Sequence, residues 1–427
     1  MKFLGIDIGT TAVCGLLLDT DDFSVPQIVT LPNRAFIKTE KEYERIQDPE
    51  MIFATVCDII NRISVKPDAI GLSGQMHGIV YLDGHCRCVS PLYTWQDERG
   101  NMPYRDGKTY AGYLGTNSGY GLSTFLYNRV NKIEPDNSRY ICTIGDYIGA
   151  RLCSLEKPLM HITNAASIGC FNVKINQFNV DCDLLPDVTD KFRFIGSTAS
   201  GIPVSVCVGD NQASFIGSVP EKDSVLINIG TGAQISYLSK TAECNSLSEV
   251  RPFDSERFLI AGCALCGGRA IALFEKFCRE VATLAGADID SYYSVFDSMD
   301  FDGFGTSVRA DCRFAGTRND SSVRGGFSGL SENNFRVRDM LYSIYEGIID
   351  ELYSMYSPSE KPKAVYCSGN GIRKNPVILG IIEKYFGVVP QVTRIAEEAA
   401  FGAALVSSTA CGAFKDIDDA GSHIEVI

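Results

Sequence analysis

Long apolar runs are missing from this chain of 427 residues. No stretch reaches the roughly 18 apolar residues that a membrane-spanning helix requires. The first residues, Met1 to Ile6, look like the start of a signal sequence, but Asp7, Thr10 and Thr11 interrupt the apolar run. Lys and Arg form no run, and the formal net charge of −13 disfavours phosphate backbones and anionic lipid. We therefore expect a cytoplasmic protein that binds neither nucleic acid nor membrane.

The cysteines show almost none of the paired spacing that is typical of metal sites. The 16 cysteines are scattered, and Cys263 and Cys266 form a lone C-x-x-C without a second Cys or His pair nearby. We interpret most cysteines as reduced core residues, in keeping with a reducing cytosol.

The common nucleotide-binding loops are absent as well. Residues 107–109 read Gly-Lys-Thr, as a Walker A loop ends, but Met102 stands where the first glycine belongs. No G-x-G-x-x-G joins the first strand to a helix, which disfavours a dinucleotide-binding fold.

A short repeat is present. Residues 6–10, Ile-Asp-Ile-Gly-Thr, are matched by residues 227–231, Ile-Asn-Ile-Gly-Thr. Each copy ends a β-rich run and is followed by another apolar run, which predicts a β-hairpin. A chain of this length favours two domains. We predict domains at 1–220 and 221–427, joined by the charged, Pro-containing stretch 218–223.

Further apolar segments end in glycine, at 69–74, 204–209 and 364–369. We interpret them as buried strands of α/β sheets, which bind ligands at the carboxyl ends of their strands. Apolar residues near helical spacing predict helices at 49–62, 269–284, 337–356 and 375–386.

The two Gly-Thr turns are candidates for phosphate binding. Glycine lets backbone amides approach phosphate oxygens, and Thr10, Thr11 and Thr231 add hydroxyl donors. One such turn alone is more often structural, but the duplication favours function. Asp7 stands where a carboxylate can hold Mg²⁺, which keeps most of its water and takes few protein ligands.

Three other positions offer chemistry, each with a structural alternative. Asp210 follows an apolar strand and is either a general base or a helix N-cap. His77, in Gln-Met-His-Gly at 75–78, is either a polyol ligand or a structural histidine. Trp95, the only tryptophan, either stacks on a sugar or fills the core.

The sequence resembles the FGGY carbohydrate kinases over nearly its whole length. The motifs that carry the resemblance are residues 5–11 (GIDIGTT), 71–78 (GLSGQMHG), 95–97 (WQD), 209–213 (GDNQA), 228–232 (NIGTG), 368–371 (SGNG) and 400–404 (AFGAA). The resemblance implies an α/β fold of two duplicated RNase H-like, actin-like ATPase domains around a central cleft. It also implies a sugar site and catalytic base in the first domain and a nucleotide site in the second.

The resemblance further implies ATP and Mg²⁺ as cofactors and a role for each matching residue. Asp210 is the implied catalytic base and Asp7 the implied metal ligand. The implied substrate-binding residues are Gln75, Met76, His77, Trp95, Asp97, Tyr120, Asp210 and Asn211. The implied nucleotide-binding residues are Thr10, Thr11, Gly230, Thr231, Gly268, Gly369, Asn370, Gly371 and Asn375.

Within the family, the likeness is greatest to members that phosphorylate sedoheptulose, a seven-carbon ketose, with xylulose and ribulose as alternatives. It rests on residues 94–99, 118–121 and 158–167. Two other classes stay open: an actin- or Hsp70-like nucleotide-switched binding protein, and a kinase that has lost catalysis. We expect the domains to close over the substrates. The oligomeric state stays open, a homodimer included.

Overall fold

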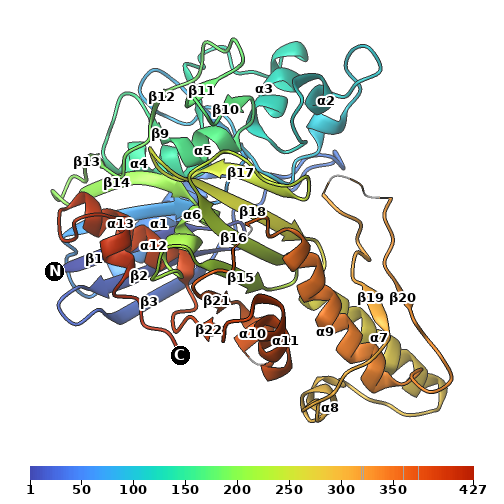
Figure 1. Ribbon diagram of the computed structural model, residues 1–427. Helices are drawn as coiled ribbons and strands as arrows, with labels where there is room; N and C mark the ends of the chain where they lie inside the picture. The colour runs from blue at the N-terminus through green and yellow to red at the C-terminus, as the bar shows by residue number, and fades with distance from the viewer. Residues whose placement is uncertain (319, 321, 359, 374) are drawn as a thin grey trace.

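Two six-stranded sheets organise the molecule (Figure 1). The computed structural model describes residues 1–318, 320, 322–358, 360–373 and 375–427. The first sheet has the order β13-β14-β5-β1-β2-β3 and the second β17-β18-β16-β15-β21-β22. The strands of the first sheet are β1 (Lys2–Ile8), β2 (Ala12–Asp19), β3 (Ser24–Pro32), β5 (Ala69–Gly74), β13 (Phe194–Ser197) and β14 (Pro203–Gly209). Those of the second are β15 (Val225–Ile229), β16 (Ala233–Ser239), β17 (Ser248–Pro252), β18 (Phe258–Ala264), β21 (Val365–Ser368) and β22 (Gln391–Val392).

The two sheets repeat one pattern of strand pairing. In the first, β1 pairs antiparallel with β2 and parallel with β5, and β5 pairs parallel with β14. In the second, β15 pairs antiparallel with β16 and parallel with β21, and β21 pairs parallel with β22. Both predicted hairpins are present, and the predicted class, two duplicated RNase H-like units, is confirmed.

Four longer helices lie where the apolar spacing predicted them: α1 (Pro49–Arg62), α7 (Gly268–Leu284), α9 (Val337–Ser354) and α11 (Pro376–Phe386). Local capping fixes the start of α1, because the Asp48 carboxylate accepts hydrogen bonds from two backbone N–H groups of the first turn. The other helices are α2 (Tyr110–Leu114), α3 (Gly121–Val130), α4 (Ile144–Leu152), α5 (Ile162–Ser167), α6 (Asp210–Ile216), α8 (Tyr293–Asp297), α10 (Asn370–Arg373), α12 (Glu398–Ala410) and α13 (Ile417–Gly421), with a 3₁₀ turn η1 (Arg99–Asn101).

Short ladders complete the fold. They pair β4 (Ile46–Gln47) with β7 (Leu92–Tyr93), β6 (Val80–Leu82) with β8 (Tyr140–Cys142), β9 (Leu159–His161) with β12 (Asp187–Thr189), β10 (Phe171–Asn172) with β11 (Gln177–Phe178), and β19 (Arg309–Asp311) with β20 (Gly326–Ser328). Of the helices in the described ranges, none has the length and apolar character needed to cross a bilayer.

Helix α12 returns to the first sheet, although it lies in the second half of the sequence. Figure 1 shows α12 beside β1 and β2, with α13 packed against α12. The contact requires glycine, because a Cβ at Gly5 or Gly71 would lie 1.8 Å from the carbonyl oxygen of Ala400 or Ala403. The strands of the first sheet thus all precede residue 220, and those of the second all follow it. Helix α12 is the exception, because it follows residue 220 but packs on the first sheet.

An apolar cluster joins the two halves. It contains Phe3 and Val208 of the first sheet, Leu226 and Leu259 of the second, and Phe401 of α12, all fully or almost fully buried. Burial of large apolar side chains between the sheets holds their strand ends in a fixed relation, on which the site depends.

Candidate active site

Two carboxylates lie at one edge of the first sheet. Asp7 is on β1 opposite Ser73 of β5, and Asp210 follows β14, whose last residue lies opposite Gly74 of β5. Because β1, β5 and β14 are parallel, their carboxyl ends meet at the same edge. The two acids are therefore one strand apart, with β5 between them.

The structure decides the role left open for Asp210 at the helix start. Gly209 occupies the N-cap position of α6, and Asp210 is the first residue of the helix. The Asp210 carboxylate accepts a hydrogen bond from Asn211 Nδ2 at 2.8 Å, and the same amide contacts Met76 Sδ at 3.6 Å. The Asp210 side chain is thus oriented by its neighbour and is not the helix cap.

Both carboxylates resist ionisation. Burial, followed by the negative charge of Asp210, raises the pKa of Asp7 to about 7, although Ser73 Oγ donates to its Oδ1 at 3.0 Å. Burial also raises the pKa of Asp210, opposed by the Asn211 hydrogen bond and by the charge of Arg251. This sheet edge therefore favours a bound proton or a bound cation.

The predicted loop 75–78 is hydrogen-bonded to the first Gly-Thr turn. Gln75 is buried, donates to Gln47 Oε1 at 3.0 Å and accepts from Thr10 Oγ1 at 3.2 Å. Trp95 Nε1 donates to the same Thr10 oxygen at 3.0 Å. The indole is 47% exposed, so Trp95 is not a core residue. Thr11 is exposed on the turn.

A cavity of about 350 Å³ lies between the two halves of the chain. Met76, His77 and Tyr120 line it from the first half, and Glu249 and Arg251 of β17 line it from the second. The His77 ring stacks on Tyr120 with 4.3 Å between ring centroids. The predicted sugar residues Met76, His77 and Tyr120 are therefore brought together, with β17 facing them.

His77 presents a neutral ring to this cavity. Its Nδ1 lies 2.8 Å from the carbonyl oxygen of Ser167, which can only accept, so Nδ1 carries the proton and Nε2 is an acceptor. Burial and then the charge of Arg251 lower the pKa of His77 to about 4. The backbone of His77 has a left-handed φ of 73°, held by the bond from its N–H to Ser167 Oγ at 3.1 Å.

Asp97 corrects one expectation. Its carboxylate is buried, accepts from Arg99 Nε at 2.7 Å and Nη2 at 3.1 Å, and also accepts from the backbone N–H of Arg45. Asp97 does not line the cavity. It holds the loop that carries Trp95, and its oxygens are committed to these protein donors rather than to a sugar.

The predicted nucleotide turns meet at the carboxyl end of β15. Gly268 N–H donates to the carbonyl of Gly230 at 2.8 Å, and Gly267 N–H donates to that of Thr231 at 3.0 Å. Gly369 has a φ of +88°, and a Cβ there would lie 2.5 Å from the carbonyl oxygen of Ile229. These glycine turns are therefore adjacent, and residues Gly230 and Thr231 are exposed.

Asn375 corrects a second expectation in part. Its Oδ1 accepts from the backbone N–H groups of Val377 at 3.1 Å and Ile378 at 3.2 Å, so Asn375 is the N-cap of α11. Its oxygen serves the helix and not an adenine edge. Gly371 packs on Ile229, and the side chain of Asn370 lies outside the described part of the structure.

No local sequence signal predicts Glu249, Arg251 and Arg318 as site residues. Arg251 Nη2 donates to Glu249 Oε2 at 3.0 Å, and Arg318 Nη1 lies 3.4 Å from Glu249 Oε1. In the sequence these residues are isolated charges outside any motif. Only the pairing of β17 with β18 brings the first two to the cavity.

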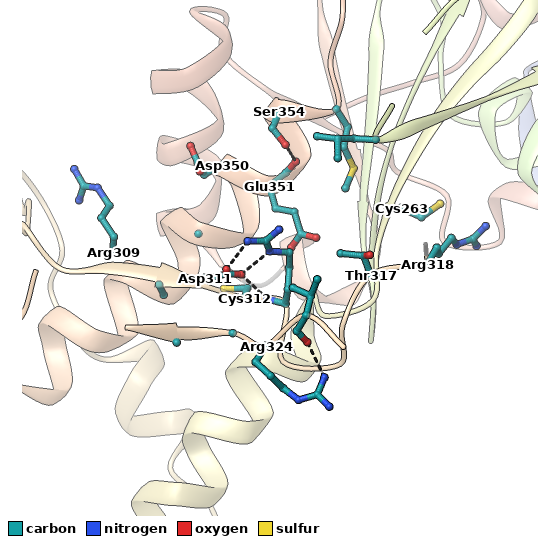
Figure 2. A pocket seen from close by; sticks show the side chains of 18 of the residues that line it. Cys263, Arg309, Asp311, Cys312, Thr317, Arg318, Arg324, Asp350, Glu351 and Ser354 are labelled. Carbon is teal, nitrogen blue, oxygen red and sulfur yellow. Dashed lines mark hydrogen bonds and ion pairs between the residues drawn. The ribbon is translucent and has the colours of Figure 1, made fainter. Parts of the chain in front are cut away.

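Figure 2 shows a larger cavity, of about 780 Å³, which shares the lining residue Glu249 with the smaller one. It is lined by α9, β18 and the β19–β20 region, and two ion pairs, Arg313 with Asp311 and Arg318 with Glu249, lie within its lining. Among its lining residues in the described chain is none that the motifs predicted for chemistry. The smaller cavity, which Met76, His77 and Tyr120 line, is therefore the candidate sugar site.

No group of three or more His, Cys, Asp or Glu side chains within the described ranges forms a metal site. The pair of Asp7 and Asp210 is instead the type of sparse carboxylate set that suits a hydrated Mg²⁺ ion.

Two sheets of one topology, with an acidic strand edge on one side and glycine turns on the other, give this chain a duplicated α/β fold. A family model described as the N-terminal domain of the FGGY family of carbohydrate kinases matches residues 2–217. The chain belongs to this family.

The sequence identity to individual relatives is low. The chain is 26% identical to Sedoheptulokinase of Mus musculus over 94% of this chain and 96% of the relative. It is 23% identical to Xylulose kinase of Staphylococcus xylosus over 95% and 90%. Among solved structures, a ligand-bound xylulose kinase from Lactobacillus acidophilus matches with a TM-score of 0.83 at 21% identity, covering 100% of this chain and 92% of that one. Glycerol kinase of Plasmodium falciparum with ADP matches with a TM-score of 0.80 at 16% identity, over 100% and 93%.

Proposed function

We propose that this protein transfers the γ-phosphoryl group of ATP to a hydroxyl of a ketose, with sedoheptulose as the first candidate. The observation that carries the proposal is the position of Asp210. Its carboxylate lies at the sheet edge beside Asp7, with the Met76–His77 cavity next to it. A base between a polyol cavity and a phosphate turn is the arrangement that phosphoryl transfer to a hydroxyl requires.

Asp210 is the proposed general base. It accepts the proton of the sugar hydroxyl as that oxygen attacks phosphorus, and Asn211 keeps its carboxylate aimed. The raised pKa of Asp210 improves it as a proton acceptor relative to an ordinary aspartate. Most of the acceleration comes from alignment of the hydroxyl and the phosphoryl group.

Asp7 is the proposed ligand for Mg²⁺. Its pKa of about 7 shows that its negative charge is poorly compensated, and Asp210 and Glu397 add to that charge. A Mg²⁺ ion held there through Asp7 would neutralise phosphate charge during transfer. Ser73 orients the carboxylate through its bond to Oδ1, which leaves Oδ2 for the ion or its water.

The second half of the chain is the proposed nucleotide domain, 221–427, and the first half, 1–220, the proposed sugar domain. Gly230 has open space at its Cβ position, while Gly268, Gly369 and Gly371 let their turns pack closely on Gly230 and Ile229. These adjacent turns at the end of β15 are the proposed site for the phosphates and adenosine. Thr11 and Thr231 are the proposed hydroxyl donors to phosphate. Thr10 belongs to the same turn as Thr11, but its hydroxyl already donates to Gln75 Oε1.

The sugar contacts proposed for the first half are His77, Tyr120, Asn211 and the indole of Trp95. His77 Nε2 accepts from a sugar hydroxyl, because Nδ1 is bound to Ser167. The likeness to relatives named Sedoheptulokinase favours sedoheptulose, and the likeness to relatives named Xylulose kinase makes xylulose the alternative.

A coupled ADP-release assay tests the proposal, with ATP, Mg²⁺ and a panel of sedoheptulose, xylulose, ribulose and glycerol. The expected result is turnover on a ketose, fastest with sedoheptulose, and its loss in Asp210→Asn. Absence of turnover on every sugar would reject the kinase. Thermal stabilisation by a ketose separates the kinase from an actin-like or Hsp70-like nucleotide switch, which has no use for a sugar site.

A further inference from the structure

Arg251 reaches the sugar cavity from the opposite half of the chain. It lies on β17 of the second sheet, is 7% exposed, and lines the cavity together with His77 and Tyr120 of the first half. One terminal nitrogen, Nη2, donates to Glu249 at 3.0 Å. The other, Nη1, is buried and has no hydrogen-bond partner among the described residues.

An unbonded guanidinium nitrogen in a buried position is costly, because water is lost and no protein acceptor replaces it. Such a group is rare in a folded protein unless a ligand supplies the acceptor. Nη1 is therefore an unpaired, buried donor of a side chain that lines the same cavity as His77.

The charges around Arg251 indicate a neutral ligand. Glu249 pairs directly with Arg251 and so compensates its charge. Arg318 approaches the other oxygen of Glu249, but its side chain is 43% exposed and solvent screens it. With His77 neutral, the wall offers hydrogen-bond donors and acceptors without a large net charge, which suits hydroxyl and carbonyl groups better than the carboxylate of a sugar acid.

The cavity accommodates the part of the sugar remote from the reaction. Asp210 is not among the residues that line it, whereas Met76, which contacts Asn211, is. The reacting hydroxyl therefore lies at the Met76 end, and the rest of the sugar chain extends towards β17.

We propose that Arg251 is a specificity-determining residue, which donates a hydrogen bond from Nη1 to an oxygen of the sugar chain remote from the phosphorylated hydroxyl. This inference rests on the proposed sugar kinase function and deepens it. In this proposal, residues of both halves of the chain contact the sugar. A longer ketose, which reaches Arg251, gains more from this contact than a shorter polyol does.

The test compares Arg251→Gln and Arg251→Lys with wild type. Trp95 is the only tryptophan and lies beside Thr10, so its fluorescence reports sugar binding without nucleotide. We expect Arg251→Gln to weaken sedoheptulose binding and raise its KM by about 10- to 100-fold, because a hydrogen bond to a charged group is lost. Glycerol, with three carbons, should show little change in KM, and kcat on sedoheptulose should stay within a few-fold. Arg251→Lys should recover part of the binding.

The matched control is Arg257→Lys. Arg257 follows β17 in the same hairpin but binds Asp254 and Asp418, away from the cavity. It should leave sedoheptulose binding unchanged, and circular dichroism should show all three variants folded.

Two results overturn the inference. If Arg251→Gln binds sedoheptulose as tightly as wild type, Arg251 does not contact the sugar. If binding is unchanged but kcat is strongly lowered, Arg251 acts at the phosphoryl group instead. If the proposed kinase function is wrong, wild type will bind sugar in the fluorescence titration but release no ADP. The comparison of sugar binding between wild type and Arg251→Gln then still decides the role of Arg251. If wild type binds no sugar from the panel, both proposals fall.

Discussion

Replacement of Asp7 by Asn should stabilise the ligand-free protein while abolishing its use of Mg²⁺. The structure indicates that the change is tolerated sterically. Asp7 lies opposite Ser73 in the first sheet, and Asn228 occupies the matching place opposite Ser368 in the second. There the amide donates to Ser368 Oγ at 2.7 Å, so the second sheet already contains an Asn in this setting.

The magnitude follows from the pKa of Asp7. Burial and the Asp210 charge raise it from the usual 3.8 to about 7. At ~1.36 kcal/mol for each unit of pKa, this difference corresponds to at most about 4 kcal/mol in the free energy of unfolding. Because Asp7 is partly exposed, solvent screening lowers the expected stabilisation to about 1–3 kcal/mol.

The sign follows from proton linkage. Between about pH 4 and pH 7 the folded protein holds the Asp7 proton and the unfolded chain does not, so wild-type stability falls as pH rises through this window. Asp7→Asn does not have this loss. The stabilising difference should therefore be small near pH 4, grow up to about pH 7 and then level off.

Thermal unfolding, followed by circular dichroism at several pH values with and without Mg²⁺, measures this difference. Asp58→Asn, on the exposed face of α1, is the control for removal of one negative charge and should not show the pH-dependent gain. Mg²⁺ should raise the wild-type midpoint and leave that of Asp7→Asn unchanged. If Asp7→Asn is no more stable than wild type above pH 7, the charge at this sheet edge is compensated and the reasoning is refuted.

Further predictions concern catalysis and packing. Asp210→Asn should keep sugar binding and lower kcat by about 10²- to 10⁴-fold, and unchanged turnover would refute its role as base. Because the pKa of Asp210 is raised, activity should decline with acid already above the pH range of an ordinary aspartate. A pH–rate profile that is flat down to about pH 4 would contradict this. Gly71→Ala should destabilise the fold by about 2–5 kcal/mol, since its Cβ would lie 1.8 Å from Ala403 O. Gly380→Ala, with open space around its Cβ, is the control and should be neutral or stabilising in urea denaturation.

The sequence by itself determined the repeated strand–turn unit. Alternation of apolar runs with Gly-Thr turns is a local signal, so both hairpins and the matching places of Asp7 and Asn228 follow from it. The starts of α1 and α11 were also predictable, because Asp48 and Asn375 cap them through bonds to residues two and three positions on.

Only the tertiary structure decided which side chains face the cavity. Asp97 carries a carboxylate that could accept hydrogen bonds from a sugar, but it forms an ion pair with Arg99 and both side chains are buried. Arg251 has no motif, and the ladder between β17 and β18 carries it to the Met76–His77 loop. Helix α12 returns to the first sheet because Gly5 and Gly71 leave room for its backbone. Each of these depends on contacts between residues remote in sequence, or on burial that a local pattern does not encode.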